Sequence, residues 1–338
     1  MKAACVVPAQ CATPALVNFI TKFTSGLFTV ALTPTRAAFL QIASTPSRQI
    51  QKDESAMQSL VSVEARHGVT TGISAFDRAK TINVLGDPSA TTRDIISPGH
   101  IFPVLTREGG ILQKISLAEG AIAAARKVHK PRIDLCEAVL FVEAINPQGQ
   151  YYSFEELQLH AKHENVPLYT LSELLKETIA VTPLVEHIAQ AKLPSSFSAD
   201  YTAHIFRSKY QEGEHIALVL GTVDPTQPTL VRVQNESTIT DVFGGQGSSR
   251  DLLRQSLNCI AQRGSGILLY LRKPEAAPMM EQTQVPGPGS EMREYGIGAQ
   301  ILSSLGVKKI ELLTQSTKAL VGLNTFGLEI VSQTRIVS

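Results

Sequence analysis

A proline- and serine-rich stretch near the middle of the chain, residues 179–203, separates two parts with different patterning. It contains Pro183, Pro194 and the run Ser195-Ser196-Phe197-Ser198, which are typical of a connection between domains. The 338 residues are too many for one ordinary core and suit two domains of roughly 150 residues each. We therefore expect a domain at residues 1–178, a linker at 179–203 and a second domain at 204–335.

Two Ser-x-x-Glu spacings in the first part predict helix starts. The run Ser116-Leu117-Ala118-Glu119 opens an alanine-rich segment that extends to about Lys130, and Ser153-Phe154-Glu155-Glu156 repeats the signal. In such a capping box each side chain satisfies an unpaired backbone N–H of the other residue. Residues 12–34 indicate a helix, a turn and a buried strand, and a short strand at 166–169 should precede a helix from residue 171. These signals indicate a mixed α+β domain.

The second part alternates strand and helix patterns, which is typical of an α/β domain. Ser249 should cap a helix that Gly264 ends, because glycine readily adopts the left-handed conformation after a last turn. The expected order is strand 215–223, strand 229–233, helix 249–264, strand 266–271, helix 295–305, strand 309–314, helix 317–324 and strand 328–331.

Composition narrows the classes of function. The 31 basic and 30 acidic residues leave a net charge of +1, which gives no general field for nucleic acid. No apolar run approaches the roughly 20 residues that span a bilayer. Four scattered cysteines indicate a reducing compartment. We expect the cytoplasm, or the plastid stroma if residues 1–52, which contain no Asp or Glu, are the remnant of a targeting segment.

The segment from Ser62 to Arg78 combines glycines, hydroxyl side chains and two arginines, which together can surround a phosphate. A solvated turn is the alternative. With Pro98-Gly99-His100-Ile101-Phe102-Pro103 and Glu108-Gly109-Gly110, it resembles the signature of 3,4-dihydroxy-2-butanone 4-phosphate synthase over residues 12–177. The resemblance implies an α+β fold with a ribulose 5-phosphate site at a dimer interface. Candidate ligand-binding residues are Arg66, Thr70, Thr71 and His100.

That family's lyase chemistry needs magnesium, held by a glutamate in an Arg-Glu-Asn-Glu-Gly-Asp motif and a histidine in a Gly-His-Thr-Glu motif. Here Met1-Lys2-Ala3-Ala4 stands where the acidic motif would be ending, and Leu117 occupies the histidine position. Residues upstream of the given start could restore the acidic motif but not the histidine. Glu64 replaces the family aspartate, and Glu119 is kept, although helix capping explains it without catalysis.

The second part resembles GTP cyclohydrolase II over residues 204–335, through residues 214–219, 240–244 and 293–302. The resemblance implies a zinc ion held by three cysteines beside an activated water. None of the three remains: Ser237 follows Glu236 at the first position, and residues 247–250 occupy the region of the other two. Cys259 on the next helix is better explained by packing.

The residues that bind the nucleotide in this second family are also largely replaced here. Of the family's phosphate loop only Arg272 clearly survives, and the Asp-x-Arg pair has become Glu291-Met292-Arg293. A weak nucleotide pocket and a set of surface charges are both open interpretations of the residues that remain, which are Arg232, Glu236, Arg272, Arg293, Thr314 and Lys318. The proline- and glycine-rich residues 274–289 suit a loop that binds a partner.

We therefore expect a non-catalytic homologue of the bifunctional riboflavin-biosynthesis enzyme, with Glu119, Glu291 and Arg293 as catalytic remnants and without zinc or magnesium. It would act as a regulatory, scaffolding or assembly subunit, in a homo-oligomer or with a different protein partner. The alternative is residual synthase or cyclohydrolase activity, or a sensor of a sugar phosphate or nucleotide, in one of the two domains.

Overall fold

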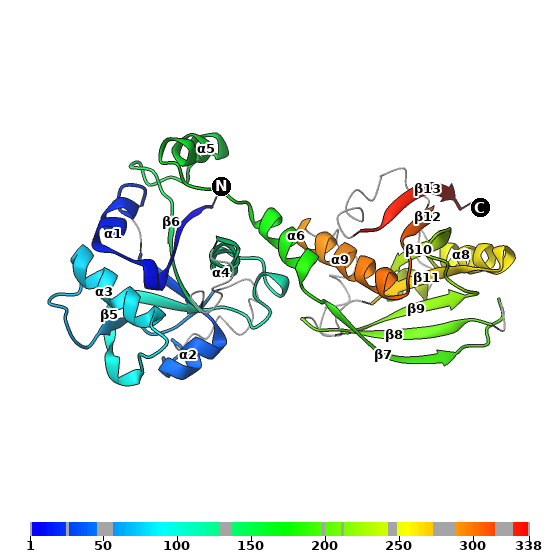
Figure 1. The fold of residues 1–338 in the computed structure, drawn as a ribbon, viewed down its shortest axis with the longest axis horizontal. Helices are drawn as coiled ribbons and strands as arrows, with labels where there is room; N and C mark the ends of the chain where they lie inside the picture. The colour runs from blue at the N-terminus through cyan, green and yellow to red at the C-terminus, as the bar shows by residue number, and fades with distance from the viewer. Residues whose placement is uncertain are drawn as a thin grey trace. The chain divides into compact units, whose positions relative to one another are not determined.

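The computed structural model describes residues 2–24, 27–45, 57–128, 137–197, 200–210, 213–242, 249–272, 288–314 and 327–336. The chain divides into two compact units, Met1–Thr178 and Ile179–Ser338, called unit 1 and unit 2 below (Figure 1). Unit 1 is an α+β domain and unit 2 is an α/β domain, which confirms the predicted fold class.

Unit 1 is built on a mixed sheet. Its order is β1-β6-β2-β5-β3, with β4 also paired to β5, and only β2 and β5 are parallel neighbours. The strands are β1 (Ala4–Pro8), β2 (Thr29–Leu32), β3 (Gln58–Ser59), β4 (Val63–Ala65), β5 (Ile95–Leu105) and β6 (Ala138–Glu143). The central β2 and β6 are almost wholly apolar, because both of their faces are buried.

Six helices accompany this sheet: α1 (Pro14–Ile20), α2 (Pro34–Leu40), α3 (Ala75–Gly86), α4 (Leu117–Val128), α5 (Phe154–His163) and α6 (Leu171–Val181). Ala118, Ala121, Ile122 and Ala125 of α4 form one core cluster with strand residues, and α1 and α3 contribute to a second cluster. The short side chains on this face of α4 let the helix approach the sheet closely. The predicted capping box between Ser153 and Glu156 is present at the start of α5.

Unit 2 contains a sheet with the order β13-β12-β10-β11-β9-β8-β7. The first four strands in this order run parallel, and the last three pair antiparallel. They are β7 (Val185–Lys192), β8 (Thr202–Ser208), β9 (Glu214–Leu220), β10 (Pro228–Asn235), β11 (Gly266–Leu271), β12 (Lys309–Thr314) and β13 (Glu329–Arg335). The pairing of β7 with β8 is irregular between His187 and Ala189.

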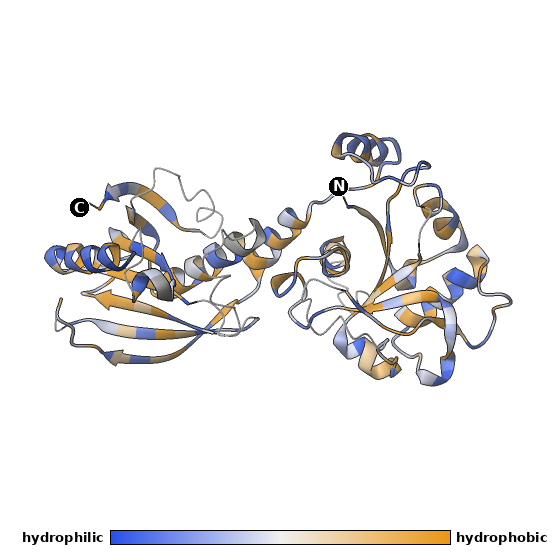
Figure 2. Ribbon diagram, turned by 180° about the vertical axis from the view of Figure 1, so that it is seen from behind, coloured by the Kyte–Doolittle hydropathy of each residue, from blue (hydrophilic) through white to orange (hydrophobic). Residues whose placement is uncertain are grey.

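The helices of unit 2 are α7 (Thr238–Asp241), α8 (Ser249–Arg263) and α9 (Pro288–Ser304). Ile260 of α8 shares a core cluster with Leu268, whereas Gly298 of α9 lies against Leu269 and Leu271. Successive strand residues point to opposite faces, so α8 and α9 cover opposite faces of the sheet. Figure 2 shows the central strands as the most hydrophobic elements, with α8 largely hydrophilic outside its buried stripe.

Three sequence expectations need correction. Residues 179–203 are not simply a linker, because β7 is a full strand of the unit 2 sheet and the unit begins at Ile179. The strand expected at residues 166–169 is irregular backbone. The acid-free amino-terminal segment supplies β1, α1, β2 and α2, so residues 4–40 are part of a folded domain rather than a targeting remnant. The helix expected at 317–324 lies outside the described residues.

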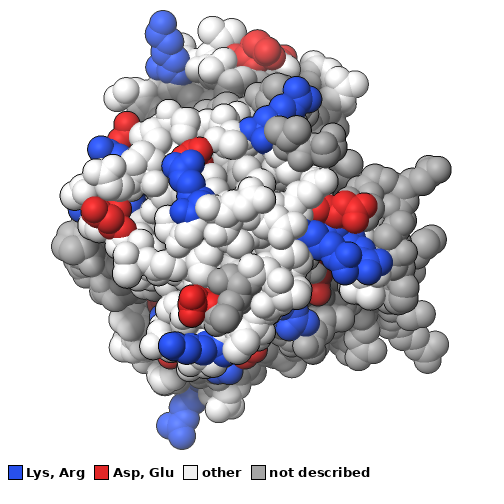
Figure 3. All heavy atoms as spheres, turned by 90° about the vertical axis from the view of Figure 1, so that its right-hand side faces the viewer, with Lys and Arg blue, Asp and Glu red and all other residues white. Residues whose placement is uncertain are grey.

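Among the described helices, none is long and apolar enough to cross a membrane. On the face of the molecule drawn in Figure 3, basic and acidic side chains are interspersed rather than gathered by sign. This distribution agrees with the near-zero net charge.

Candidate functional site

The candidate residues of unit 1 lie where β4 leads through a turn into α3. Val63–Ala65 pair antiparallel with β5, and Ser74 caps α3 by accepting a hydrogen bond from the backbone N–H of Asp77 at 3.0 Å. The sequence predicted a loop over this whole segment, but the structure has a strand, a tight turn and a helix start. These elements fix the backbone on both sides of the turn.

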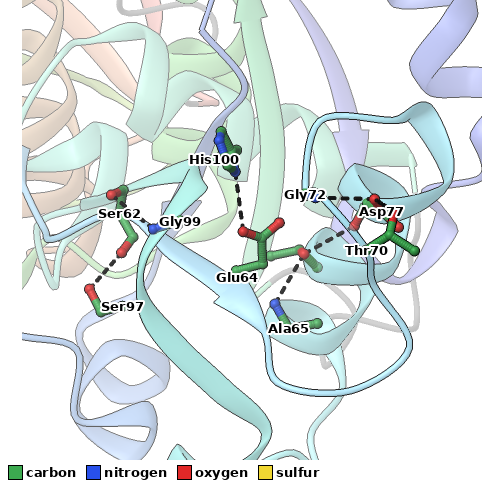
Figure 4. Close-up of polar contacts among 10 residues, drawn as sticks. Ser62, Glu64, Ala65, Thr70, Gly72, Asp77, Ser97, Gly99 and His100 are labelled. Carbon is green, nitrogen blue, oxygen red and sulfur yellow. Dashed lines mark hydrogen bonds and ion pairs between the residues drawn. The ribbon is translucent and has the colours of Figure 1, made fainter.

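A carboxylate and an imidazole meet between β4 and β5 (Figure 4). Glu64 Oε2 lies 3.1 Å from His100 Nδ1; the Glu64 side chain is 12% exposed and that of His100 is 45% exposed. Gly72, in the left-handed region at φ +77°, passes so close that a Cβ atom there would lie 1.6 Å from Glu64 Oε1. The turn therefore needs glycine here because the Glu64 carboxylate occupies the space of a side chain.

Asp77 organises the turn itself. Its Oδ2 accepts hydrogen bonds from Thr70 Oγ1 at 2.9 Å and from the Gly72 backbone N–H at 3.1 Å. Burial alone would raise the pKa of Asp77, but the hydrogen bonds from Thr70, Gly72 and Ser74 outweigh it and lower the pKa below its usual value. The Thr70 hydroxyl is thus bonded within the protein, although both Thr70 and Thr71 are exposed at the surface.

Arg66 also bonds to the protein's own backbone. Its Nε donates to the Arg93 carbonyl at 2.7 Å, and Nη2 donates to the Ile95 carbonyl at 3.2 Å. The guanidinium of Arg78 lies 4.5 Å from the centre of the Phe28 ring. These contacts hold both side chains in place, but both guanidinium groups keep their charge and the buried Nε of Arg78 has no hydrogen-bond partner, so the predicted phosphate site is not excluded.

Glu119 is buried, at 2% exposure, near the start of α4. Its Oε1 accepts from the Arg107 backbone N–H at 3.2 Å, and its other oxygen accepts from the Ser116 hydroxyl. The helix begins at Leu117 as predicted, but the hydrogen bonds differ from the reciprocal box that was expected, because Ser116 Oγ receives the Ala118 N–H. Leu117 packs against the core cluster under α4, so an apolar contact occupies this position.

The candidates of unit 2 gather at the carboxyl ends of the parallel strands β10, β11 and β12, where α/β sheets commonly bind ligands. Arg232 on β10 donates to the Leu313 carbonyl at 3.3 Å and to Gln234 Oε1 at 2.7 Å. Arg272 Nε lies 3.7 Å from Glu236 Oε1. Burial lowers the pKa of Arg232. The structure thus brings together, at the carboxyl ends of these strands, Arg232, Glu236, Arg272 and Thr314.

His215 lies beneath Arg272, and the sequence analysis did not single it out. Its Nδ1 accepts the Arg272 backbone N–H at 3.2 Å, whereas its buried Nε2 has no hydrogen-bond partner. Burial, and then the charge of Arg272, lower the pKa of His215 to about 4. Strand alternation would place this residue inside, but only the structure reveals the unused nitrogen.

A second hydrogen-bond network includes the backbone of Ser237. Asp241 Oδ2 accepts from the Ser237 backbone N–H at 2.8 Å and from the Tyr270 hydroxyl at 2.7 Å. Burial and the hydrogen bond to Asp241 raise the pKa of Tyr270. Neither Tyr270 nor Asp241 was predicted from the sequence, because each is individually an ordinary strand or helix residue.

The remaining predicted residues lie on or beside α9. Arg293 is partly buried in α9, and burial lowers its pKa although Glu294 acts in the opposite direction. The backbone of Glu291 also lies in α9, and its side chain is not described. Lys318 and the predicted partner-binding loop, apart from its last two residues, lie outside the described residues.

Two positions that the resemblances assign to metal ligands carry residues of poor donor chemistry, Leu117 and Ser237. Within the described ranges, no three His, Cys, Asp or Glu side chains come together as a metal cluster. Leu117 offers no donor, and a serine at position 237 is a poor zinc ligand beside a cysteine thiolate. We therefore derive no chemical step through either metal.

Comparison with known proteins agrees with the two-unit fold. The family model of 3,4-dihydroxy-2-butanone 4-phosphate synthase matches residues 2–177, and that of GTP cyclohydrolase II matches residues 186–335. Fold and matches together define a two-domain protein of the synthase–cyclohydrolase type. The chain belongs to the family of bifunctional riboflavin-biosynthesis proteins, which confirms both resemblances.

Individual relatives span nearly the whole chain. The riboflavin biosynthesis protein RibBA of Aquifex aeolicus (strain VF5) is 33% identical over 98% of this chain and 85% of its own length. A 3,4-dihydroxy-2-butanone 4-phosphate synthase of Photobacterium phosphoreum is 31% identical over 96% and 90%. The crystal structure of RibBX, described as a two-domain synthase from A. baumannii, superposes with a TM-score of 0.78 at 25% identity, over 99% and 91%.

Proposed function

We propose that this chain is a non-catalytic member of the bifunctional riboflavin-biosynthesis family that serves as a regulatory, scaffolding or assembly subunit. The observation that carries the proposal is Leu117. At the position where the family resemblance places a magnesium-binding histidine, a partly buried apolar side chain packs against the core cluster of α4. The family's reaction uses a magnesium ion to stabilise an enediolate, and a single polar residue elsewhere would not replace that ion.

The polar groups of the synthase turn support the same proposal. Arg66, Thr70 and Asp77 form hydrogen bonds to one another or to the backbone, and these bonds are made without a ligand. Glu119 is held by the backbone of residue 107 and by a neighbouring hydroxyl. Such groups stabilise a fold without needing a substrate.

The second unit supports the proposal independently. Ser237 takes the place of a zinc-binding cysteine, and its backbone belongs to the network of Asp241 and Tyr270. Relatives of comparable length from Photobacterium phosphoreum and A. baumannii are described by the synthase activity alone. These names are compatible with a second domain that persists in the family for a reason other than GTP hydrolysis.

A second candidate, binding of a sugar phosphate to unit 1, is favoured by the pair of Glu64 and His100. The half-exposed imidazole beside a largely buried carboxylate can accept or donate a proton at a ligand hydroxyl. On this alternative, unit 1 retains residual synthase activity or senses its ligand.

Turnover by the purified full chain tests these proposals. We expect no product above background from GTP with zinc, or from ribulose 5-phosphate with magnesium. Product that disappears in Glu64→Gln, but persists in the matched surface variant Glu164→Gln, would overturn the non-catalytic proposal in favour of the second candidate.

The subunit role needs its own measurement. We expect the chain to co-elute with an active two-domain RibBA protein and to change the rate of that enzyme at equimolar ratio. Separate elution together with an unchanged rate would reject a regulatory or assembly role towards such a partner.

A further inference from the structure

Two histidines meet on the strands at the far side of the unit 2 sheet, which are not neighbours of the strands that carry Arg232 and Arg272. His187 lies on β7 and His204 on β8, and His204 Nδ1 is 3.2 Å from His187 Nε2. Their ring centres are 5.2 Å apart with planes inclined by 30°, and the His187 ring also packs on Phe206 at 4.8 Å. The pair is therefore ordered by packing as well as by its shared hydrogen bond.

Strand pairing places these rings on the same face of the sheet. His187 stands opposite Phe206, and His204 lies two residues from Phe206 along β8, so the three side chains share one face. The extra residue between His187 and Ala189, as in a β-bulge, comes after His187 and reverses the alternation only for the residues that follow it. The two imidazoles are therefore diagonal neighbours across the β7–β8 pair.

The separation of the two nitrogens suits a shared metal ion. With metal–nitrogen bonds of about 2.0–2.1 Å, a nitrogen separation of 3.2 Å corresponds to an angle of roughly 100° at the metal. That angle lies between the square-planar and tetrahedral values. Imidazole nitrogens are preferred ligands of zinc, copper and nickel.

A histidine binds a metal ion through a ring nitrogen that carries no proton. Burial, and then the neighbouring His187, lower the pKa of His204, which favours its neutral form. One ring must move its N–H hydrogen to its other nitrogen through solvent before the two lone pairs can converge. This change of tautomer releases no net proton.

We propose that His187 and His204 together bind one divalent transition-metal ion and thereby fasten β7 to β8. The described part of the chain groups no third His, Cys, Asp or Glu with them, so water completes the coordination. Binding of copper or nickel should exceed that of zinc, which follows the usual order of divalent metals with nitrogen ligands.

Titration of nickel into the full chain, purified without a histidine tag, tests this site. We expect one nickel ion per chain, and removal of one of the two imidazoles should weaken binding by at least about tenfold. His187→Ala and His204→Ala are the test variants. His163→Ala is the matched control, because His163 is an exposed histidine in unit 1 and its loss should leave the affinity unchanged.

Thermal unfolding of unit 2 gives a second readout. Nickel should raise the unfolding midpoint of the wild type and of His163→Ala but not that of His187→Ala, because an ion bound only to the folded state stabilises it. His187 is the more exposed ring, so His187→Ala decides the question even if His204→Ala fails to fold. Absence of nickel binding to the wild type, or equal affinity in His187→Ala, would overturn the proposal.

The same variants keep this site separate from the proposed function. Zinc that is lost in His187→Ala belongs to the histidine pair and leaves the non-catalytic proposal intact. Zinc retained in that variant together with GTP turnover would contradict the non-catalytic proposal and say nothing against the pair.

Discussion

The two candidate sites have diverged from the family pattern in different physical ways. In unit 1 Arg66, Thr70 and Asp77 of the turn between β4 and α3 are bonded to the protein itself, while the buried Nε of Arg78 has no hydrogen-bond partner. In unit 2 the strand ends retain buried polar atoms without protein partners, among them His215 Nε2 and Arg232 Nε. If the proposed loss of catalytic ligands is correct, it has left the two units with differently organised polar groups.

The largest expected effect is at the turn between β4 and α3. Gly72→Ala should destabilise unit 1 by about 3 kcal/mol, because the new methyl group strains the backbone and collides with the Glu64 carboxylate. Gly68→Ala is the matched control, since its φ of +78° imposes the same strain while the nearest contact would be 3.6 Å away. Urea unfolding followed by hydrogen exchange of the β4–α3 peptides measures both. Equal losses in the two variants would show that Glu64 does not fill the space beside Gly72.

The second effect concerns acid stability of unit 2. The folded pKa of His215, about 4, lies below its unfolded value of 6.5, so its contribution is complete above pH 6.5 and is lost as the pH falls towards 4. The difference corresponds to about 3 kcal/mol. His215→Gln should flatten this dependence, as measured by hydrogen exchange of β9 and β11 between pH 7 and pH 4. If protection in the variant falls with pH as steeply as in the wild type, protonation of the His215 imidazole does not destabilise unit 2.

Unit 1 should respond to acid at lower pH. The folded pKa of Asp77 is depressed, so its stabilising contribution is present above the unfolded pKa near 3.8 and is lost as the pH falls through the folded pKa. Asp77→Asn should reduce the acid sensitivity of the β4–α3 turn below about pH 4. Exchange at the Gly72 amide, which bonds to Asp77, is the local probe. Loss of protection in unit 1 already near pH 6 would reverse the contrast with unit 2.

The smallest effect separates a structural from a ligand-binding role for Arg66. Arg66→Gln removes two hydrogen bonds to carbonyl oxygens and should cost about 1 kcal/mol. Phosphate added at millimolar concentration should stabilise the wild type and the variant equally. A phosphate-dependent stabilisation confined to the wild type would restore Arg66 as an anion ligand.

The sequence predicted several elements with buried apolar faces, but it did not predict the almost wholly buried strand β6 or the exposed strand β7. Residues 266–271 and 309–314 were predicted as strands and are β11 and β12, because each is apolar throughout or on alternate positions. Strand β7 was missed because Val185–Lys192 is largely exposed and half of its residues are polar or charged. Such a strand gains its stability from pairing with a neighbour, which a single sequence does not display.

Candidate residues followed the same division. Arg66, Thr70 and His100 were identified by residue type, yet their partners Asp77, Arg93 and Glu64 depend on how the turn is folded. His215 was missed because a histidine in an apolar strand gives no sign of which ring nitrogen will find a partner. The family resemblance led to the prediction that the metal ligands are replaced, whereas tertiary contacts determine the present role of each remaining group.

The extra residue in β7 also affects how unit 2 meets foreign chains. Among the described strands β7 ends the sheet, and a regular edge strand would offer evenly spaced backbone groups on which another strand could grow. The irregular pairing interrupts that spacing, and the exposed Glu186 and Lys192 add charge along the same edge. This edge is therefore protected against uncontrolled polymerisation, and deleting Ile188 to restore regular pleating should make the protein more prone to fibrous aggregation.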